Sequence, residues 1–174
     1  MERWPTVTPW WQGYGPVRLH LPPLVWARAA IGAGLGLWVA HLVLRGLGSG
    51  QTALIAPFGA TAFLIFVVPG SPLAQPWPVV VGNTVSALAA LFVLQLGLPQ
   101  VAVICLSVAL AVLAMALTHA MHPPGGAVAI ATALAAPSLN FVLTPVAVGS
   151  AVLVLAGLIW HRTTGQPYPY RHSP

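Results

Sequence analysis

Two histidines, His119 and His122, stand three residues apart at the end of an apolar run, and the stretch HPPGGA begins at the second of them. Imidazole is the side chain that gains or loses a proton near neutral pH. An ionisable group inside an apolar segment indicates a functional site. We therefore interpret His122 as a group that couples solute passage to a proton, with bracing of the turn as the structural alternative. For His119 the alternative is a position at the membrane interface.

The prolines and glycines after His122 predict the start of a short helix. Proline is tolerated in the first helical turn, and glycine lets a ligand approach the backbone closely. A helix start carries unpaired N–H groups and a partial positive charge, so it binds anions without a charged side chain. The site residues predicted in this part of the chain are His119, His122, Pro123, Pro124, Gly125, Gly126 and Ala127.

The same turn occurs a second time, earlier in the chain. The sequence APFGATAFL at Ala56–Leu64 shares the pattern P-x-G-A-x-A with PPGGAVAIA, which begins at Pro123, at an offset of 67 residues. Broken helices at matching positions of two halves indicate the binding site of a transporter. The halves are parallel if the short helices are re-entrant and inverted if each half crosses three times. The site residues predicted here are Pro57, Phe58, Gly59, Ala60 and Thr61.

The surrounding apolar runs predict the elements that position these turns. Four runs are long enough to cross the roughly 30 Å hydrocarbon core, and two shorter runs fit half-helices. The long runs are Trp26–Leu44, Pro78–Leu96, Val101–Leu117 and Phe141–Trp160, and the short ones are Thr52–Val68 and Pro124–Ala136. The predicted fold is an all-α membrane domain over 26–162 with repeat halves of about 26–97 and 98–162. Residues 1–25 form an interfacial segment and residues 163–174 a tail.

Composition supports a membrane protein and restricts its substrate. Hydrophobic residues make up 58% of the chain and charged residues 4%, too few charges to cover a soluble domain. The only acid is Glu2, so a cation would find no carboxylate in the spans, and an anion or a neutral solute fits better. Asn83, a costly amide in lipid, either faces the cavity or hydrogen-bonds across helices.

The arginines favour a multi-pass protein of the inner (plasma) membrane with both termini in the cytoplasm. The six arginines form no dense patch for nucleic acid. Two histidines fall short of the three or four ligands of a usual metal site. No nucleophile, base and acid occur together, so we expect no enzyme, metal or cofactor.

Three blocks of the sequence resemble the HPP family of integral membrane proteins. They are HPPGGA at His122–Ala127, APFGATAFLIF at Ala56–Phe66 and PGSPLAQPWPVVVGNTVSAL at Pro69–Leu88, and the likeness covers about residues 25–162. The family is described with four transmembrane helices, and its chloroplast and cyanobacterial members are associated with nitrite. The resemblance thus implies a small-anion transporter. Gly125 replaces a common alanine, a small change that keeps the turn. Asn83 replaces a common histidine, and if position 83 lines the pathway, the resemblance implies a difference in substrate or proton coupling.

The leading hypothesis is a transporter or channel for a small monovalent anion such as nitrite, held at the two helix starts. One alternative is a channel for a small neutral solute. Another is a membrane scaffold, which predicts that both turns pack against their neighbours without a cavity. The expected partners are the lipid bilayer, a small inorganic anion and further copies of the chain, with the pore within or between protomers.

Overall fold

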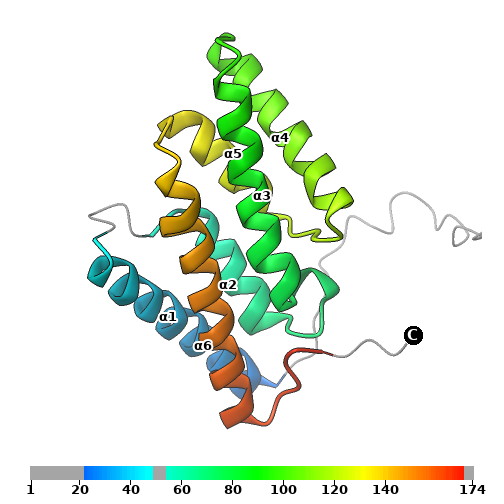
Figure 1. Cartoon of the computed structure of the whole chain (residues 1–174). Coiled ribbons are helices and arrows are strands. Elements are labelled where there is room, and N and C mark those ends of the chain that lie inside the picture. Colours follow the sequence, from blue (N-terminus) through cyan, green and yellow to red (C-terminus); the bar gives the residue numbers. More distant parts are fainter. Residues whose placement is uncertain (1–21, 49–53, 171–174) are drawn as a thin grey trace, which may run out of the picture.

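The computed structural model describes residues 22–48 and 54–170, and every regular element within them is helical (Figure 1). In chain order these are α1 Pro23–Gly46, α2 Pro57–Val67, η3 Pro72–Ala74, α3 Pro76–Leu94, α4 Gln100–Leu117, α5 Pro124–Ala135, η4 Val142–Ala147 and α6 Val148–Thr164. Four segments are long and apolar enough to cross a membrane: α1, α3, α4 and η4–α6, which is kinked at Thr144. The predicted all-α fold with four spans and two short helices is confirmed. Most of the predicted interfacial segment 1–25 lies outside the described residues.

Prolines explain where the helices begin. Proline occupies the first position of α1, α2, α3 and α5, where its missing N–H leaves no hydrogen bond unmade. For this reason the first and second spans start at Pro23 and Pro76, slightly earlier than predicted. Left-handed residues lie just beyond several helix ends, among them His119 (φ 52°) after α4, Ala136 (φ 42°) after α5 and Gly165 (φ 71°) after α6.

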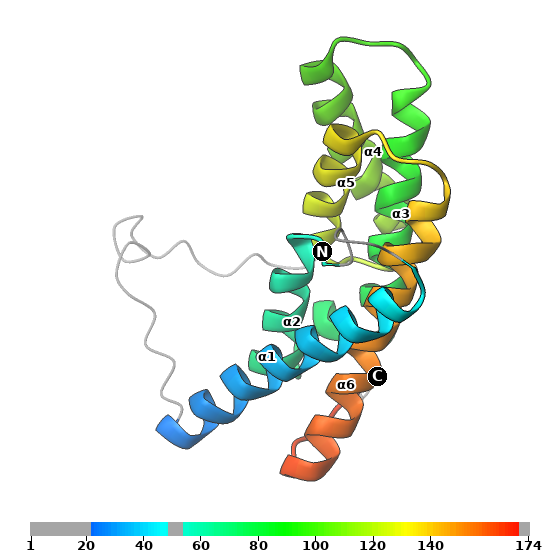
Figure 2. The same ribbon diagram turned by 90° about the vertical axis from the view of Figure 1, so that its left-hand side faces the viewer.

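The two short helices run in opposite directions from the middle of the molecule (Figures 1 and 2). α2 and α5 contain 11 and 12 residues, about 17–18 Å each, or roughly half the hydrocarbon core. Their N-termini meet, and each helix then extends toward a different end. α3 and α6 likewise run in opposite directions.

Helix contacts follow a pseudo-twofold arrangement that decides between the two repeat topologies. α1 packs against α2 and α6, while α4 packs against α5 and α3. Exchanging α1–α2–α3 for α4–α5–α6 converts one set of contacts into the other. Because α2 and α5, and likewise α3 and α6, run in opposite directions, this exchange relates two inverted halves.

The crossing of short and long helices depends on glycine at matching positions. In the first half the fully buried Phe58 lies against Gly149, where an added Cβ would come within 2.5 Å of the phenyl ring. In the second half the counterparts are Gly125 and Gly82, and a Cβ on Gly125 would lie 3.1 Å from the Gly82 carbonyl oxygen. Both crossings thus need a glycine on the long helix, Gly149 on α6 and Gly82 on α3. The facing residues on the short helices differ in size, since one is Phe58 and the other is Gly125.

The outer surface of the helices is apolar, as contact with lipid requires. Large exposed side chains include Trp38 on α1, Phe92 on α3, Leu113 on α4 and Ile159 on α6, each at least 60% exposed. In water such a surface would be costly, since roughly 25 cal/mol is lost per Å² of exposed apolar area. These helices therefore face the bilayer.

Candidate functional site

A buried polar cluster lies where the N-termini of α2 and α5 meet α3 and α6. It contains Thr61 of α2, Asn83 of α3, Ser150 of α6 and His122, which precedes α5. All four residues have zero exposed area. Thr61 Oγ1 is 3.0 Å from His122 Nε2, and Asn83 Nδ2 lies 3.4 Å from Thr61 Oγ1 and 3.0 Å from Ser150 Oγ. Four separate elements thus converge on one hydrogen-bonded chain.

The partners of His122 fix its tautomer. Nδ1 lies 2.8 Å from the carbonyl oxygen of Leu73, which can only accept, so Nδ1 carries the hydrogen. In the neutral ring Nε2 is then the acceptor, and the Thr61 hydroxyl donates to it. Thr61 Oγ1 in turn accepts from the Asn83 amide. The direction of donation therefore runs from Asn83 through Thr61 to His122 and from His122 to Leu73.

One acceptor in this cluster has no partner. Asn83 Oδ1 is buried without a hydrogen bond, an exception among buried polar groups. Turning the amide by 180° would not help, because Thr61 donates its only hydroxyl hydrogen to His122 and can only accept from position 83. Asn83 therefore keeps its N–H groups toward Thr61 and Ser150, and its free acceptor is Oδ1.

The pseudo-twofold axis of the repeat passes close to Asn83 and Ser150. These two residues are separated by 67 residues, the offset of the repeated motif, and they hydrogen-bond to each other. Asn83 was predicted either to face a cavity or to bond across helices, and it does bond across helices. Ser150 was not predicted, although adding the repeat offset to Asn83 would have identified it.

The backbone N–H groups at the two helix starts are paired, contrary to prediction. Phe58 and Gly59 donate to the carbonyl oxygens of Ile55 and Ala56 at 3.0 and 3.1 Å. Gly125 and Gly126 donate to those of His122 and Pro123 at 2.8 and 3.0 Å. The reason is local: the residues before each helix, Ala56 and Pro123, already have right-handed helical angles, so a tight turn precedes each helix. What remains at these ends is the positive end of the helix dipole.

The remaining predicted site residues divide by burial. Pro57, Phe58, Pro124 and Gly125 are buried beside the cluster, and Gly126 is half-buried. The other predicted site residues are exposed: Gly59, Ala60, His119, Pro123 and Ala127. His119 therefore does not join His122, because the left-handed turn at His119 ends α4 and separates the two rings. Among the described residues His, Cys, Asp and Glu form no group of three that could hold a metal.

Comparisons with known proteins agree with this architecture. The family model described as "HPP, transmembrane region" matches residues 19–169. A transmembrane protein of Dictyostelium discoideum is 36% identical over 161 residues, which cover 86% of this chain and 51% of that protein. A second transmembrane protein of the same organism is 34% identical over 115 residues, 61% of this chain and 40% of that protein. The chain thus spans about half the length of these relatives or less, and no solved structure matches it.

The family match covers both short helices, all four long segments and the polar cluster between them. The two relatives are themselves named as transmembrane proteins. Together with the apolar helices, these matches establish a multi-pass membrane protein, and the chain belongs to the HPP transmembrane family.

Proposed function

We propose that the protein moves a small monovalent anion across the membrane, with nitrite as the first substrate to test. One observation carries this proposal. Two short helices start at the middle of an inverted repeat, and both N-termini adjoin the buried cluster of Thr61, Asn83, His122 and Ser150. Broken helices at a repeat interface are typical of the substrate sites of secondary transporters.

Charge at this point favours an anion. Each helix N-terminus carries roughly half a positive charge, and two of them face the same cluster. The described residues contain no Asp or Glu, so no carboxylate offsets these dipoles. The cluster supplies hydroxyl and amide groups, and a solute that accepts hydrogen bonds would take the place of bonds within it.

Access to the cluster requires the two halves to move. Its four residues have zero exposure, and they line neither the pocket between α1 and α6 nor the pocket between α1 and α2. The hydrogen bond between Thr61 and Asn83 is the longest of the cluster, 3.4 Å, and therefore the weakest. We expect α2 to separate from α3 at this bond. Rocking of one repeat against the other around a fixed site is the general mode of such transporters.

Transport is tested by uptake into proteoliposomes. Nitrite, nitrate, formate and chloride are offered to vesicles that contain the purified protein or the Asn83→Leu variant. We expect uptake of at least one anion and a loss of tenfold or more in Asn83→Leu, because leucine removes both the donors and the free acceptor. If none of the four anions moves or binds, the proposal fails. Flux that does not respond to membrane voltage would instead favour a neutral solute.

A second candidate is a membrane scaffold without transport, and the close packing of both turns favours it. Ser86 Oγ would lie 2.6 Å from a Cβ on Gly125, so nothing separates this turn from α3. A scaffold needs the cluster only for stability. It therefore predicts that Asn83→Leu, if folded, behaves like the wild type in every flux assay.

A further inference from the structure

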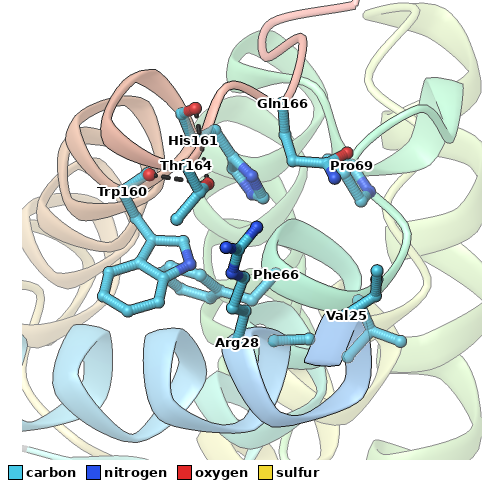
Figure 3. A pocket seen from close by; sticks show the side chains of 10 residues that line it. Val25, Arg28, Phe66, Pro69, Trp160, His161, Thr164 and Gln166 are labelled. Carbon is cyan, nitrogen blue, oxygen red and sulfur yellow. Dashed lines mark hydrogen bonds between the residues drawn. The ribbon is translucent and has the colours of Figure 1, made fainter. Parts of the chain in front are cut away.

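A small pocket with polar side chains in a mostly apolar wall lies at one end of the molecule, away from the central cluster, and is called the polar pocket below. It has a volume of about 40 Å³ and lies between the first turns of α1, the end of α2 and the last turns of α6 (Figure 3). A single water needs about 10–15 Å³ of such space, so this pocket holds a group of a few heavy atoms. Arg28, Trp160, His161 and Gln166 supply polar groups to its wall.

Arg28 is a cation without an acidic partner in the part of the chain that the structure describes, because no Asp or Glu occurs there. Figure 3 shows its guanidinium pointing from α1 into the space below His161 and beside Trp160. The Trp160 indole lies over Gly32, where a Cβ would come within 2.6 Å of Nε1, so glycine is what admits the indole to this position. Guanidinium and indole N–H groups together match the oxygens of a phosphate.

His161 forms part of the wall of the same pocket, and its ring is fixed in place. The residue is 2% exposed, and its Nε2 donates to the Ile65 carbonyl oxygen at 2.8 Å. Its Nδ1 is buried without a hydrogen-bond partner. Because Nε2 carries the hydrogen, Nδ1 is an acceptor, and it does not itself bind a phosphate oxygen, which also accepts.

An apolar groove adjoins this pocket along the lipid-facing side of α1 and α6. Its volume is about 510 Å³, and it shares Phe66 and Trp160 with the polar pocket. From Gly32 to Val43 it follows about 17 Å of helix, close to the thickness of one leaflet's hydrocarbon. Its lining is aliphatic and aromatic apart from Thr163.

The geometry points to a binding site for one anionic phospholipid, with its phosphate at Arg28 and Trp160 and one acyl chain in the groove. Three features have to coincide for this ligand: a cation without a partner, a pocket the size of a headgroup fragment, and an apolar groove that begins at that pocket. Arg28 and Trp160 also lie near the ends of their helices, where arginine and tryptophan meet lipid headgroups. The site is separate from the proposed transport cluster, so neither proposal depends on the other.

Native mass spectrometry of the purified protein, released from mixed vesicles of phosphatidylglycerol and phosphatidylcholine, tests the site. The wild type should retain phosphatidylglycerol in preference. Arg28→Gln should weaken this retention about fivefold, the usual contribution of one basic residue near an anionic surface. Arg45→Gln is the matched control, because Arg45 is exposed at the other end of the same helix. Equal retention in both arginine variants overturns the proposal.

A second pair of variants tests the groove. Val39→Trp places a large ring in it, whereas Val101→Trp places the same ring on an exposed position of α4. Only Val39→Trp should release the lipid. If Val39→Trp changes a dimer into a monomer and leaves lipid retention intact, the groove binds a second copy and the proposal is wrong. Binding of inorganic phosphate that depends on Arg28, without retention of phosphatidylglycerol, equally overturns it in favour of a free anion.

Discussion

Replacing Thr61 by valine tests whether the central cluster is hydrogen-bonded as described. Valine keeps the branched shape of threonine but removes the hydroxyl that donates to His122 Nε2 and accepts from Asn83. His122 cannot compensate by changing its tautomer, because Nδ1 must keep its hydrogen to donate to Leu73. The substitution therefore leaves a buried acceptor without a donor.

Two ranges of measured free energies bear on the expected loss of stability, one from soluble proteins and a lower one from membrane proteins. A stranded buried acceptor costs about 1–3 kcal/mol in soluble proteins. Hydrogen bonds between membrane helices average about 0.6 kcal/mol and reach about 1.7, since the unfolded chain in lipid also finds partners. Zero exposure at His122 excludes rescue by surface water and argues for the upper part of the membrane range. We expect Thr61→Val to lower the free energy of unfolding by about 1–2 kcal/mol.

The chain offers a matched control in Thr132. It has the same zero exposure, but its hydroxyl bonds only to the Val128 carbonyl oxygen of its own helix at 2.8 Å. Such back-bonding contributes little, so Thr132→Val should change stability by less than about 0.5 kcal/mol. Reversible unfolding in mixed micelles, followed by helical circular dichroism, measures both variants against the wild type. Equal unfolding free energies for the two variants would refute the assigned hydrogen bond between Thr61 and His122.

Two further predictions concern packing and the C-terminal segment. Gly149→Ala should cost about 1–3 kcal/mol, because its Cβ would clash with the Phe58 ring; the control Gly34→Ala meets nothing within 4 Å and should be neutral or slightly stabilising. Tyr168, after the last helix, donates to the Ala74 carbonyl oxygen at 3.0 Å, and burial raises the pKa of its phenol. A raised pKa means that the folded state holds the proton more tightly, so this contribution is present below about pH 10 and is lost as the pH rises further. Wild-type stability should therefore fall more steeply than that of Tyr168→Phe as the pH rises above about 10, and parallel curves would contradict the burial of this phenol.

The helices were predictable because their signals are local. Runs of apolar residues set the spans, and Pro57 and Pro124 set the starts of the short helices. The partners of His122 were not predictable in this way. Leu73 and Thr61 lie 49 and 61 residues away, and they reach His122 only through the packing of one half of the chain against the other. The pairing of the N–H groups at the helix starts was missed because it depends on the backbone angles of Ala56 and Pro123, which no residue type specifies.

The repeat itself argues that the polar cluster is not required for packing. Shifting by 67 residues turns His122 into Ile55 and Thr61 into Val128. Val128 belongs to a buried apolar cluster, and Ile55 packs against that cluster. On one side of the pseudo-twofold axis, therefore, this protein makes the contact with aliphatic side chains, and on the other side it makes the contact with a histidine and a threonine. Buried polar groups cost stability unless fully paired, and here Asn83 Oδ1 remains unpaired. Since the apolar version of the same contact already folds in this chain, stability alone does not explain the polar version. That asymmetry supports the proposed solute site over a scaffold.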